Sequence, residues 1–242
     1  MLPVRTSEGA PAVLKIGFPE VESEHEHLVL RRWAGHGAVR LLRADPRQRC
    51  LLLERLRPHR LDTVSDLDAC ELVAALQRRL HVPALPQLRS LSSCVEQWSE
   101  EFQALPRSAP LPRRLVEQAV SLSHDLTAEP AGADVVLHGN LHYGNVLGAD
   151  REPWLAIAPR PLNGDPHYEL APMLWHRWDH LGSRIRDGVR NRLYTLVEAA
   201  GLDEDRARDW VIVRVVHEAI RALGADASTL TRYVTLAKAI QD

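Results

Sequence analysis

The residues with the clearest chemical pattern lie between 136 and 147, where the chain reads VLHGNLHYGNVL. This segment combines histidines and amides with two glycines and is flanked by short apolar runs. Its two histidines, His138 and His142, are four residues apart but lack the glutamate of a zinc-binding H-E-x-x-H helix. His25 and His27 are two apart on an expected helix and point in different directions. We therefore do not expect a zinc site, and interpret His138 as a brace for its loop.

Composition narrows the classes of partner. The 242 residues include 30 Lys plus Arg and 32 Asp plus Glu, which gives a formal charge of -2 and no basic field for a nucleic-acid backbone. No apolar run reaches the length needed to cross a bilayer, and the first residues lack the apolar stretch of a signal peptide. The three cysteines are widely spaced, which argues against a disulfide framework. We expect a cytoplasmic protein without nucleic-acid or membrane partners.

The first 57 residues have a strand-rich pattern. Apolar segments at 4–6 and 12–16 surround a Gly9 turn and predict a hairpin, followed by a helix over 21–34 and strands at 39–42 and 50–56. Beyond Pro58 helices dominate: 66–81 with Ser65 as N-cap, 94–105, 112–128, 186–200, 203–224 and 226–240. Short β segments are expected within 134–158.

This order predicts an α+β protein with two lobes. A small mixed N-lobe with an antiparallel sheet would span residues 1–57, and a larger helical C-lobe would span 58–242, with the catalytic-loop region at 134–166. A ligand is expected in the cleft between two such lobes.

The segment around residue 140 resembles the catalytic loop of the aminoglycoside and hydroxyurea antibiotic resistance kinases, which reads H-G-D-L-H-x-x-N and is followed by a strand ending I-D-P. The similarity also includes the LLLERL run at 51–56 and the DPHYELAPMLWHRW run at 165–178. It covers nearly the whole chain. It implies a protein-kinase-like fold, ATP and Mg²⁺ as cofactors, and phosphoryl transfer to an alcohol group of an aminoglycoside-like antibiotic.

The resemblance assigns roles to individual residues. Lys15 corresponds to the lysine that holds the nucleotide phosphates, and Glu26 is its expected carboxylate partner, with Glu24 as the second choice. Asn145 corresponds to the metal-binding asparagine. The backbone near Glu54 and Leu56 would meet the adenine as the hinge strand.

Two positions depart from the family pattern. Asn140 stands where the family has its catalytic aspartate, and Ala158 stands where it has the metal-binding aspartate of I-D-P. An amide cannot accept the proton of a substrate hydroxyl, and alanine offers Mg²⁺ no oxygen. In addition, only 14 residues precede Lys15, so we expect the nucleotide-covering strand and loop to be missing. ATP binding is therefore expected to be weak or absent.

Structural roles compete with these assignments. Lys15 could be a solvated strand lysine, Glu26 a surface carboxylate, and Asn145 a turn residue. Asp165, between glycine and proline, is interpreted as a turn stabiliser.

Three functions follow. The first hypothesis is a catalytically inactive or severely impaired kinase-like protein. The second is an active ATP-dependent phosphotransferase in which another carboxylate substitutes, with Asp165 and Glu169 the nearest in sequence. The third is a non-catalytic binding or regulatory partner of an unknown protein.

Overall fold

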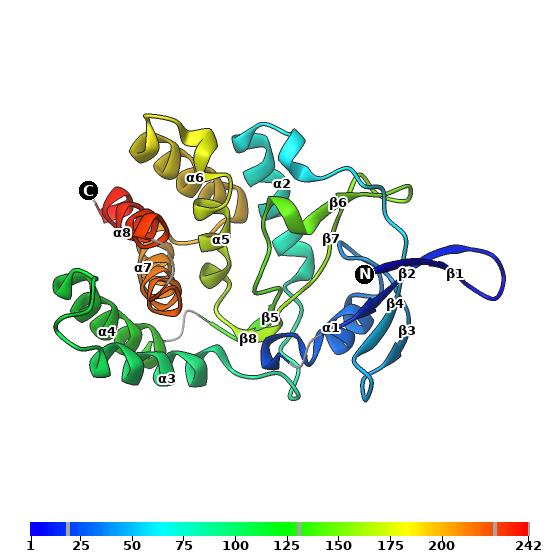
Figure 1. The fold of residues 1–242 in the computed structure, drawn as a ribbon, viewed down its shortest axis with the longest axis horizontal. Helices are drawn as coiled ribbons and strands as arrows, with labels where there is room; N and C mark the ends of the chain where they lie inside the picture. Colours follow the sequence, from blue (N-terminus) through cyan, green and yellow to red (C-terminus); the bar gives the residue numbers. More distant parts are fainter. Residues whose placement is uncertain (18–19, 130–131, 225–226, 242) are drawn as a thin grey trace.

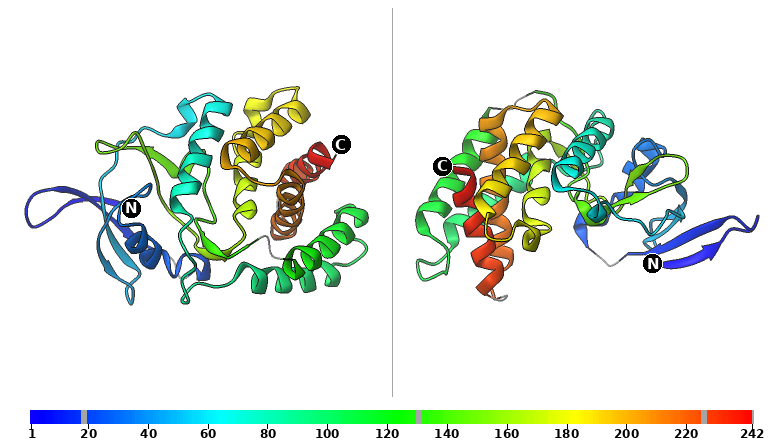
Figure 2. Two further views of the ribbon diagram at one scale, coloured as in Figure 1. Left: turned by 180° about the vertical axis from the view of Figure 1, so that it is seen from behind. Right: turned by 90° about the horizontal axis from the view of Figure 1, so that it is seen from above.

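The N-lobe is built on a four-stranded antiparallel sheet. The computed structural model describes residues 1–17, 20–129, 132–224 and 227–241. Strands β1 (Leu2–Arg5), β2 (Pro11–Ile16), β3 (Leu41–Asp45) and β4 (Cys50–Glu54) are ordered β1-β2-β4-β3. The β1–β2 hairpin turns at Gly9, which has a φ of +84°, and projects from the rest of the molecule (Figure 2). Within the sheet, β2 places Lys15 opposite Leu51 of β4.

Helix α1 (Glu26–Trp33) follows the hairpin and packs its apolar side against the sheet. The observed helix is thus shorter than the one predicted over 21–34. Residues Val21–Ser23 form the 3-10 turn η1, in which no side chain is buried, and His25 precedes α1 with non-helical backbone angles. This charged first turn has no apolar packing to hold it in the α-helix.

Two small antiparallel sheets carry the segment that the sequence singled out. Strand β5 (Val135–Leu137) pairs with β8 (Leu162–Gly164), and β6 (Val146–Gly148) pairs with β7 (Trp154–Ala156). The 3-10 turn η3 (Tyr143–Asn145) leads into β6. These strands lie between the N-lobe sheet and the helices (Figure 1).

Helices form the rest of the C-lobe. They are α2 (Asp66–Leu80), α3 (Leu91–Ala104), α4 (Arg113–Ala128), α5 (Ala171–Trp175), α6 (Ile185–Ala200), α7 (Glu204–Arg221) and α8 (Ala227–Gln241), with 3-10 turns η2 (Leu61–Thr63), η4 (Pro166–Leu170) and η5 (Trp178–Leu181). The predicted N-cap of α2 is confirmed, since the Ser65 side chain accepts the Asp68 amide. Residue 226, where the last helix was predicted to start, lies outside the described residues. The prediction contained neither β8 nor the η4–α5 segment.

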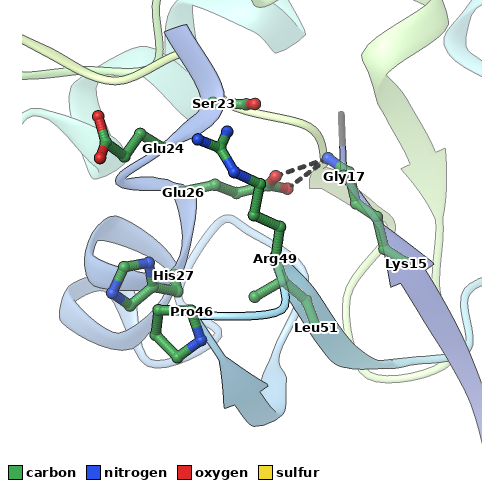
Figure 3. A pocket seen from close by; sticks show the side chains of 9 residues that line it. All are labelled: Lys15, Gly17, Ser23, Glu24, Glu26, His27, Pro46, Arg49 and Leu51. Carbon is green, nitrogen blue, oxygen red and sulfur yellow. Dashed lines mark hydrogen bonds and ion pairs between the residues drawn. The ribbon is translucent and has the colours of Figure 1, made fainter. Parts of the chain in front are cut away.

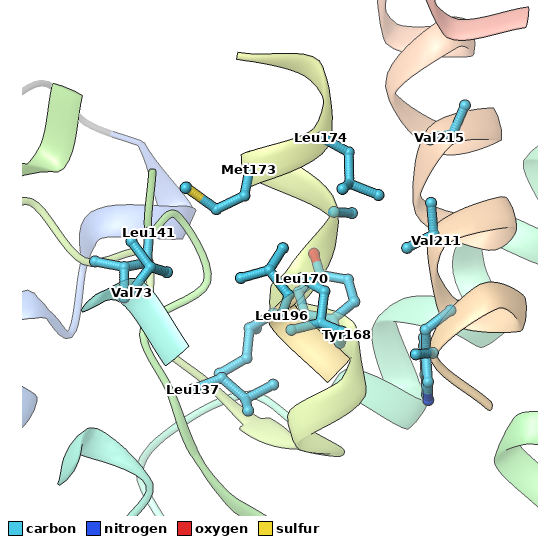
Figure 4. Close-up of a cluster of buried hydrophobic side chains, with 14 of the residues drawn as sticks. Val73, Leu137, Leu141, Tyr168, Leu170, Met173, Leu174, Leu196, Val211 and Val215 are labelled. Carbon is cyan, nitrogen blue, oxygen red and sulfur yellow. The ribbon is translucent and has the colours of Figure 1, made fainter. Parts of the chain in front are cut away.

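The η4–α5 segment is the centre of the C-lobe core. Leu170, Met173 and Leu174 are fully buried. They lie between the loop residue Leu141 on one side and Val211 of α7 on the other (Figure 4). Burial of one such side chain stabilises the fold by about 1.5–3 kcal/mol. This packing fixes the loop around residue 140 to the helical scaffold. The α+β, two-lobed architecture is confirmed, whereas the boundary at residue 57 stays a prediction.

Candidate functional site

Lys15 of β2 and Glu26 of α1 form an ion pair within the N-lobe. The Lys15 Nζ lies 2.7 Å from Glu26 Oε1 and 2.6 Å from Oε2, and the two side chains point toward one another (Figure 3). Burial raises the pKa of Glu26, and the charge of Lys15 opposes this rise. A small cavity of about 70 Å³ adjoins the pair. Glu24 lines the same cavity, but the ion pair uses Glu26.

Asn140 follows β5 in a loop whose backbone is held on three sides. The Gly139 amide donates to Glu169 Oε1 at 2.6 Å, and its carbonyl accepts from Arg214 at 2.6 Å. Gly139 has a φ of +73°, and a Cβ there would lie 2.1 Å from the Arg160 carbonyl oxygen. Only glycine fits between these two segments. Asn140 is therefore displayed on a rigid loop.

The two carboxylates nearest in sequence are occupied by structural contacts. Glu169 is buried, and its second oxygen lies 2.8 Å from His81 Nε2. Asp165 bonds His167 Nδ1 and Arg206 Nε, both at 2.5 Å, and the indole N–H of Trp210 at 2.9 Å. Burial alone would raise the pKa of Asp165, but these hydrogen bonds hold it well below its usual range. Asp165 is the turn residue that the sequence indicated, with its side chain also tied to α7.

Asn145 lies beside Asn140 with its amide oriented by the protein. Its Nδ2 donates to the Asn140 carbonyl oxygen at 2.8 Å and lies 3.0 Å from His142 Nε2. Among the described residues, this leaves Oδ1 as the free acceptor of the amide. The Asn145 carbonyl oxygen accepts the backbone N–H of Ile157 at 2.9 Å. This contact brings the next residue, Ala158, close to Asn145.

This donor set does not fit a magnesium ion held by protein carboxylates. Asn145 supplies one neutral oxygen, Asn140 carries an uncharged amide and Ala158 has no side-chain oxygen, whereas Mg²⁺ prefers carboxylate oxygens. No group of three or more His, Cys, Asp or Glu side chains within the described ranges could hold a metal. Ala158 also has a φ of +54°, a left-handed conformation that alanine adopts at a cost.

A larger cavity of about 330 Å³ opens beside Asn140 in the C-lobe. Besides Asn140 it is lined by aromatic, basic and acidic side chains from η1, α3, η4, α5, α7 and α8, and from the loops before α3, before β8 and after α5. These are Glu22, Arg89, Trp98, Arg160, Tyr168, Trp175, His176, Arg214, His217, Glu218, Arg221, Arg232 and Tyr233. A small molecule in this cavity would lie against Asn140.

The histidines near the loop are neutral and structural. His138 is fully buried, with Nε2 at 3.1 Å from the Ile157 carbonyl, and burial lowers its pKa to about 4. It also stacks on Trp33 of α1. His142 stacks on His176 with ring centroids 3.6 Å apart, and burial lowers their pKa values to about 3 and about 4. The proposed bracing role of His138 agrees with these contacts.

At the expected hinge, the Glu54 side chain is engaged by Arg151. Arg151 Nη2 lies 2.6 Å from Glu54 Oε1 and donates to the Ala38 carbonyl at 2.8 Å. The Glu54 amide donates to the Arg40 carbonyl at 3.0 Å. Within the described part of the chain, the backbone N–H and C=O of Leu56 form no hydrogen bond. An adenine edge would therefore find its free backbone groups at Leu56 and not at the Glu54 amide.

Sequence reasoning did not identify several residues that build this site. Arg214, His81, His176 and the supporting role of Glu169 were missed. Arg214 carried a usable signal, because an arginine within the apolar run WVIVRVV of α7 must find buried partners. His176 had no such signal, since its contact with His142 arises only in the folded chain.

Comparison with known proteins identifies the family. The sequence model of the family described as aminoglycoside/hydroxyurea antibiotic resistance kinase matches residues 1–225. The chain belongs to this family. It is 42% identical to a streptomycin 6-kinase of Streptomyces glaucescens over 252 aligned positions, which cover 100% of this chain and 80% of that protein. It is 39% identical to a hydroxyurea phosphotransferase of Kitasatospora aureofaciens, covering 91% of this chain and 64% of that protein.

Solved structures show the same fold at low sequence identity. The aminoglycoside phosphotransferase APH(4)-Ia has a TM-score of 0.68 at 14% identity, covering 97% of this chain and 87% of the other. The choline kinase LicA of Streptococcus pneumoniae has a TM-score of 0.67 at 13% identity, covering 98% and 88%. The predicted kinase-like fold and family are thus confirmed. In the described residues, no helix is long and apolar enough to cross a membrane.

Proposed function

We propose that this chain is a member of the antibiotic kinase family whose phosphoryl transfer is severely impaired. The observation that carries the proposal is that Asn140 occupies a rigid loop while both neighbouring carboxylates are committed to other partners. Loss of a positioned general base lowers a rate by about 10²- to 10⁴-fold. The absence of a carboxylate at Ala158 lowers it further, because the nucleotide charge is then less well neutralised.

The nucleotide-binding half is better preserved than the catalytic half. The Lys15–Glu26 ion pair supports a role for Lys15 in holding phosphates and for Glu26 in positioning it, and the free backbone of Leu56 supports an adenine contact. We propose weak ATP binding, with Asn145 as the remaining protein oxygen for the metal. The three free cysteines fit a reducing, cytoplasmic location.

The test compares the parent with the Asn140→Asp/Ala158→Asp double variant in ATP and Mg²⁺. ADP release is measured together with mass-spectrometric detection of phosphorylated streptomycin or hydroxyurea, the compounds that the relatives' names specify. Product from the double variant alone would support the proposal. An Asn140→Ser/Ala158→Asp variant is the matched control, since it restores the metal position without a base.

Product from the parent would overturn the proposal in favour of an active phosphotransferase. The next variant would then be His176→Ala, because His176 is a neutral imidazole that lines the Asn140 cavity. A binding or regulatory role is the remaining alternative. That alternative would be favoured if the chain forms a stable complex with another protein and neither the parent nor the double variant transfers phosphate.

A further inference from the structure

The cavity beside Asn140 has an excess of positive charge. Its lining includes the arginines Arg89, Arg160, Arg214, Arg221 and Arg232, against the carboxylates of Glu22 and Glu218. Glu22 is shared, since it lies 2.9 Å from Arg160 and 2.7 Å from Arg221. Among the described residues, the other three arginines form no ion pair with a carboxylate. Glu218 is thus the one remaining carboxylate in the lining that could balance the charges of these three arginines.

Buried polar atoms at this cavity also lack partners. Arg214 is only 4% exposed; its Nη1 and Nη2 donate to the Tyr168 and Gly139 carbonyls, but its Nε has no hydrogen bond. His217, 8% exposed, has an unpartnered Nδ1, and Arg232 has an unpartnered Nε. Buried polar groups in native proteins are nearly always paired. Three buried atoms around one cavity without a partner in the described chain favour a ligand with polar groups.

Aromatic side chains supply the remaining walls. Trp98 stacks on His217 with ring centroids 4.0 Å apart, and Trp175 meets Tyr233 edge to face at 5.9 Å. Tyr168 is covered by the Arg214 guanidinium at 4.0 Å from its ring centroid. The volume of about 330 Å³ is that of a small-molecule site. Flat apolar surfaces beside guanidinium groups suit a planar ring that carries a negative charge.

We infer that the cavity beside Asn140 binds a small planar aromatic anion, whose carboxylate or phosphate group would pair with an arginine of the lining that has no carboxylate partner, and that it disfavours a polycation. A polycationic ligand would meet the like charge of these guanidinium groups, which is costly. The inference deepens the proposed function, because it treats this cavity as the acceptor side of the kinase cleft. It concerns binding alone and requires neither ATP nor phosphoryl transfer.

Isothermal titration calorimetry with the full chain and no nucleotide tests this inference. The probes are naphthoate and naphthyl phosphate as aromatic anions, naphthamide as the neutral analogue, and streptomycin as the cation. We expect at least one anion to bind about tenfold or more tighter than naphthamide, as one charge-assisted contact provides. We also expect both anions to bind more weakly as salt is raised, and streptomycin to bind more weakly than either.

Variants locate the site. Arg232→Gln is expected to remove most of the anion preference. Arg89→Gln tests a second positive charge of the cavity, at an exposed position where the substitution does not endanger folding. Arg184→Gln is the matched control, because Arg184 is exposed and does not line the cavity. Failure of both anions to bind, equal affinity for naphthamide, or tighter binding of streptomycin would overturn the inference. So would an anion affinity unchanged in both cavity variants. Any of these results would leave the proposed loss of catalysis intact, since the latter is judged by ADP and product formation.

Discussion

Glu169 accepts the backbone amide of Gly139 at 2.6 Å while its other carboxylate oxygen lies 2.8 Å from His81. The side chain is fully buried, so one carboxylate links the C-cap residue of α2 to the loop that presents Asn140. Burial would raise the pKa of Glu169, but the hydrogen bond and charge of His81 and the amide of Gly139 lower it. The charged carboxylate nearest to Asn140 in this loop thus has a structural task.

Replacement of Glu169 by alanine is expected to destabilise the fold by about 3–5 kcal/mol, because His81 and the Gly139 amide lose their buried partner. Glu169→Gln should cost less, since an amide can still bond both groups. Glu198→Gln, exposed on α6, serves as the control. Chemical denaturation measures all three. Equal stability of Glu169→Ala and Glu198→Gln would show that this link does not hold the loop.

Gly139 provides a second test of the same loop. Gly139→Ala would force a Cβ against the Arg160 carbonyl oxygen at 2.1 Å in addition to a positive φ. We expect a loss of at least about 4 kcal/mol, the range of severe backbone and packing defects. Gly9→Ala is the matched control, because Gly9 has a φ of +84° with open space around it. It should lose only about 1–2 kcal/mol, the cost of the left-handed conformation. Similar losses in both variants would contradict the close approach.

Much of the fold was predictable because it follows local patterns. Ser65 caps α2 where predicted, and the apolar stripes gave the long helices to within a few residues. The η4–α5 segment was missed because its buried residues form two short turns that never complete an amphipathic period. Its stability comes from packing between α6 and α7, which is a tertiary property.

The site was predictable only where a motif names its residues. Lys15 and Glu26 were singled out by resemblance, and the fold brings them together across eleven positions of sequence. The brace formed by Glu169 and Arg214 joins residues 30 and 75 positions away from Gly139. Neither separation leaves a periodic trace in the sequence. The excess positive charge of the cavity was hidden for the same reason, since its five arginines come from α7, α8 and two loops.

Ala158 is a position at which a substitution is expected to increase the stability of the fold. Its φ of +54° costs alanine about 1–2 kcal/mol, and glycine relieves this strain. Ala158→Gly is therefore expected to raise the free energy of unfolding, and Ala158→Asn should raise it less. Ala207→Gly, inside α7, is the control and should lower stability by about 1 kcal/mol. A loss of stability in Ala158→Gly would contradict the left-handed assignment.

The Lys15–Glu26 pair predicts a pH-dependent defect. Lys15→Met keeps the length of the side chain but leaves the buried carboxylate without its cation, and we expect a loss of about 3 kcal/mol at neutral pH. Burial already raises the pKa of Glu26, and removal of Lys15 deletes the charge and hydrogen bond that oppose this. The folded carboxyl then binds a proton at a higher pH than the unfolded one. The defect should therefore shrink as pH falls through the raised pKa of Glu26.

Denaturation curves at neutral pH and at about pH 5 measure this effect. The Lys15→Met/Glu26→Gln double variant is the control, because it removes the buried charge altogether. It should recover at least half of the neutral-pH loss and lose the pH dependence of the single variant. A Lys15→Met defect of the same size at both pH values would mean that Glu26 is not held as a charged partner of Lys15. In that case the position of Lys15 would depend on packing in β2, and the phosphate-binding role proposed for it would lose its electrostatic support.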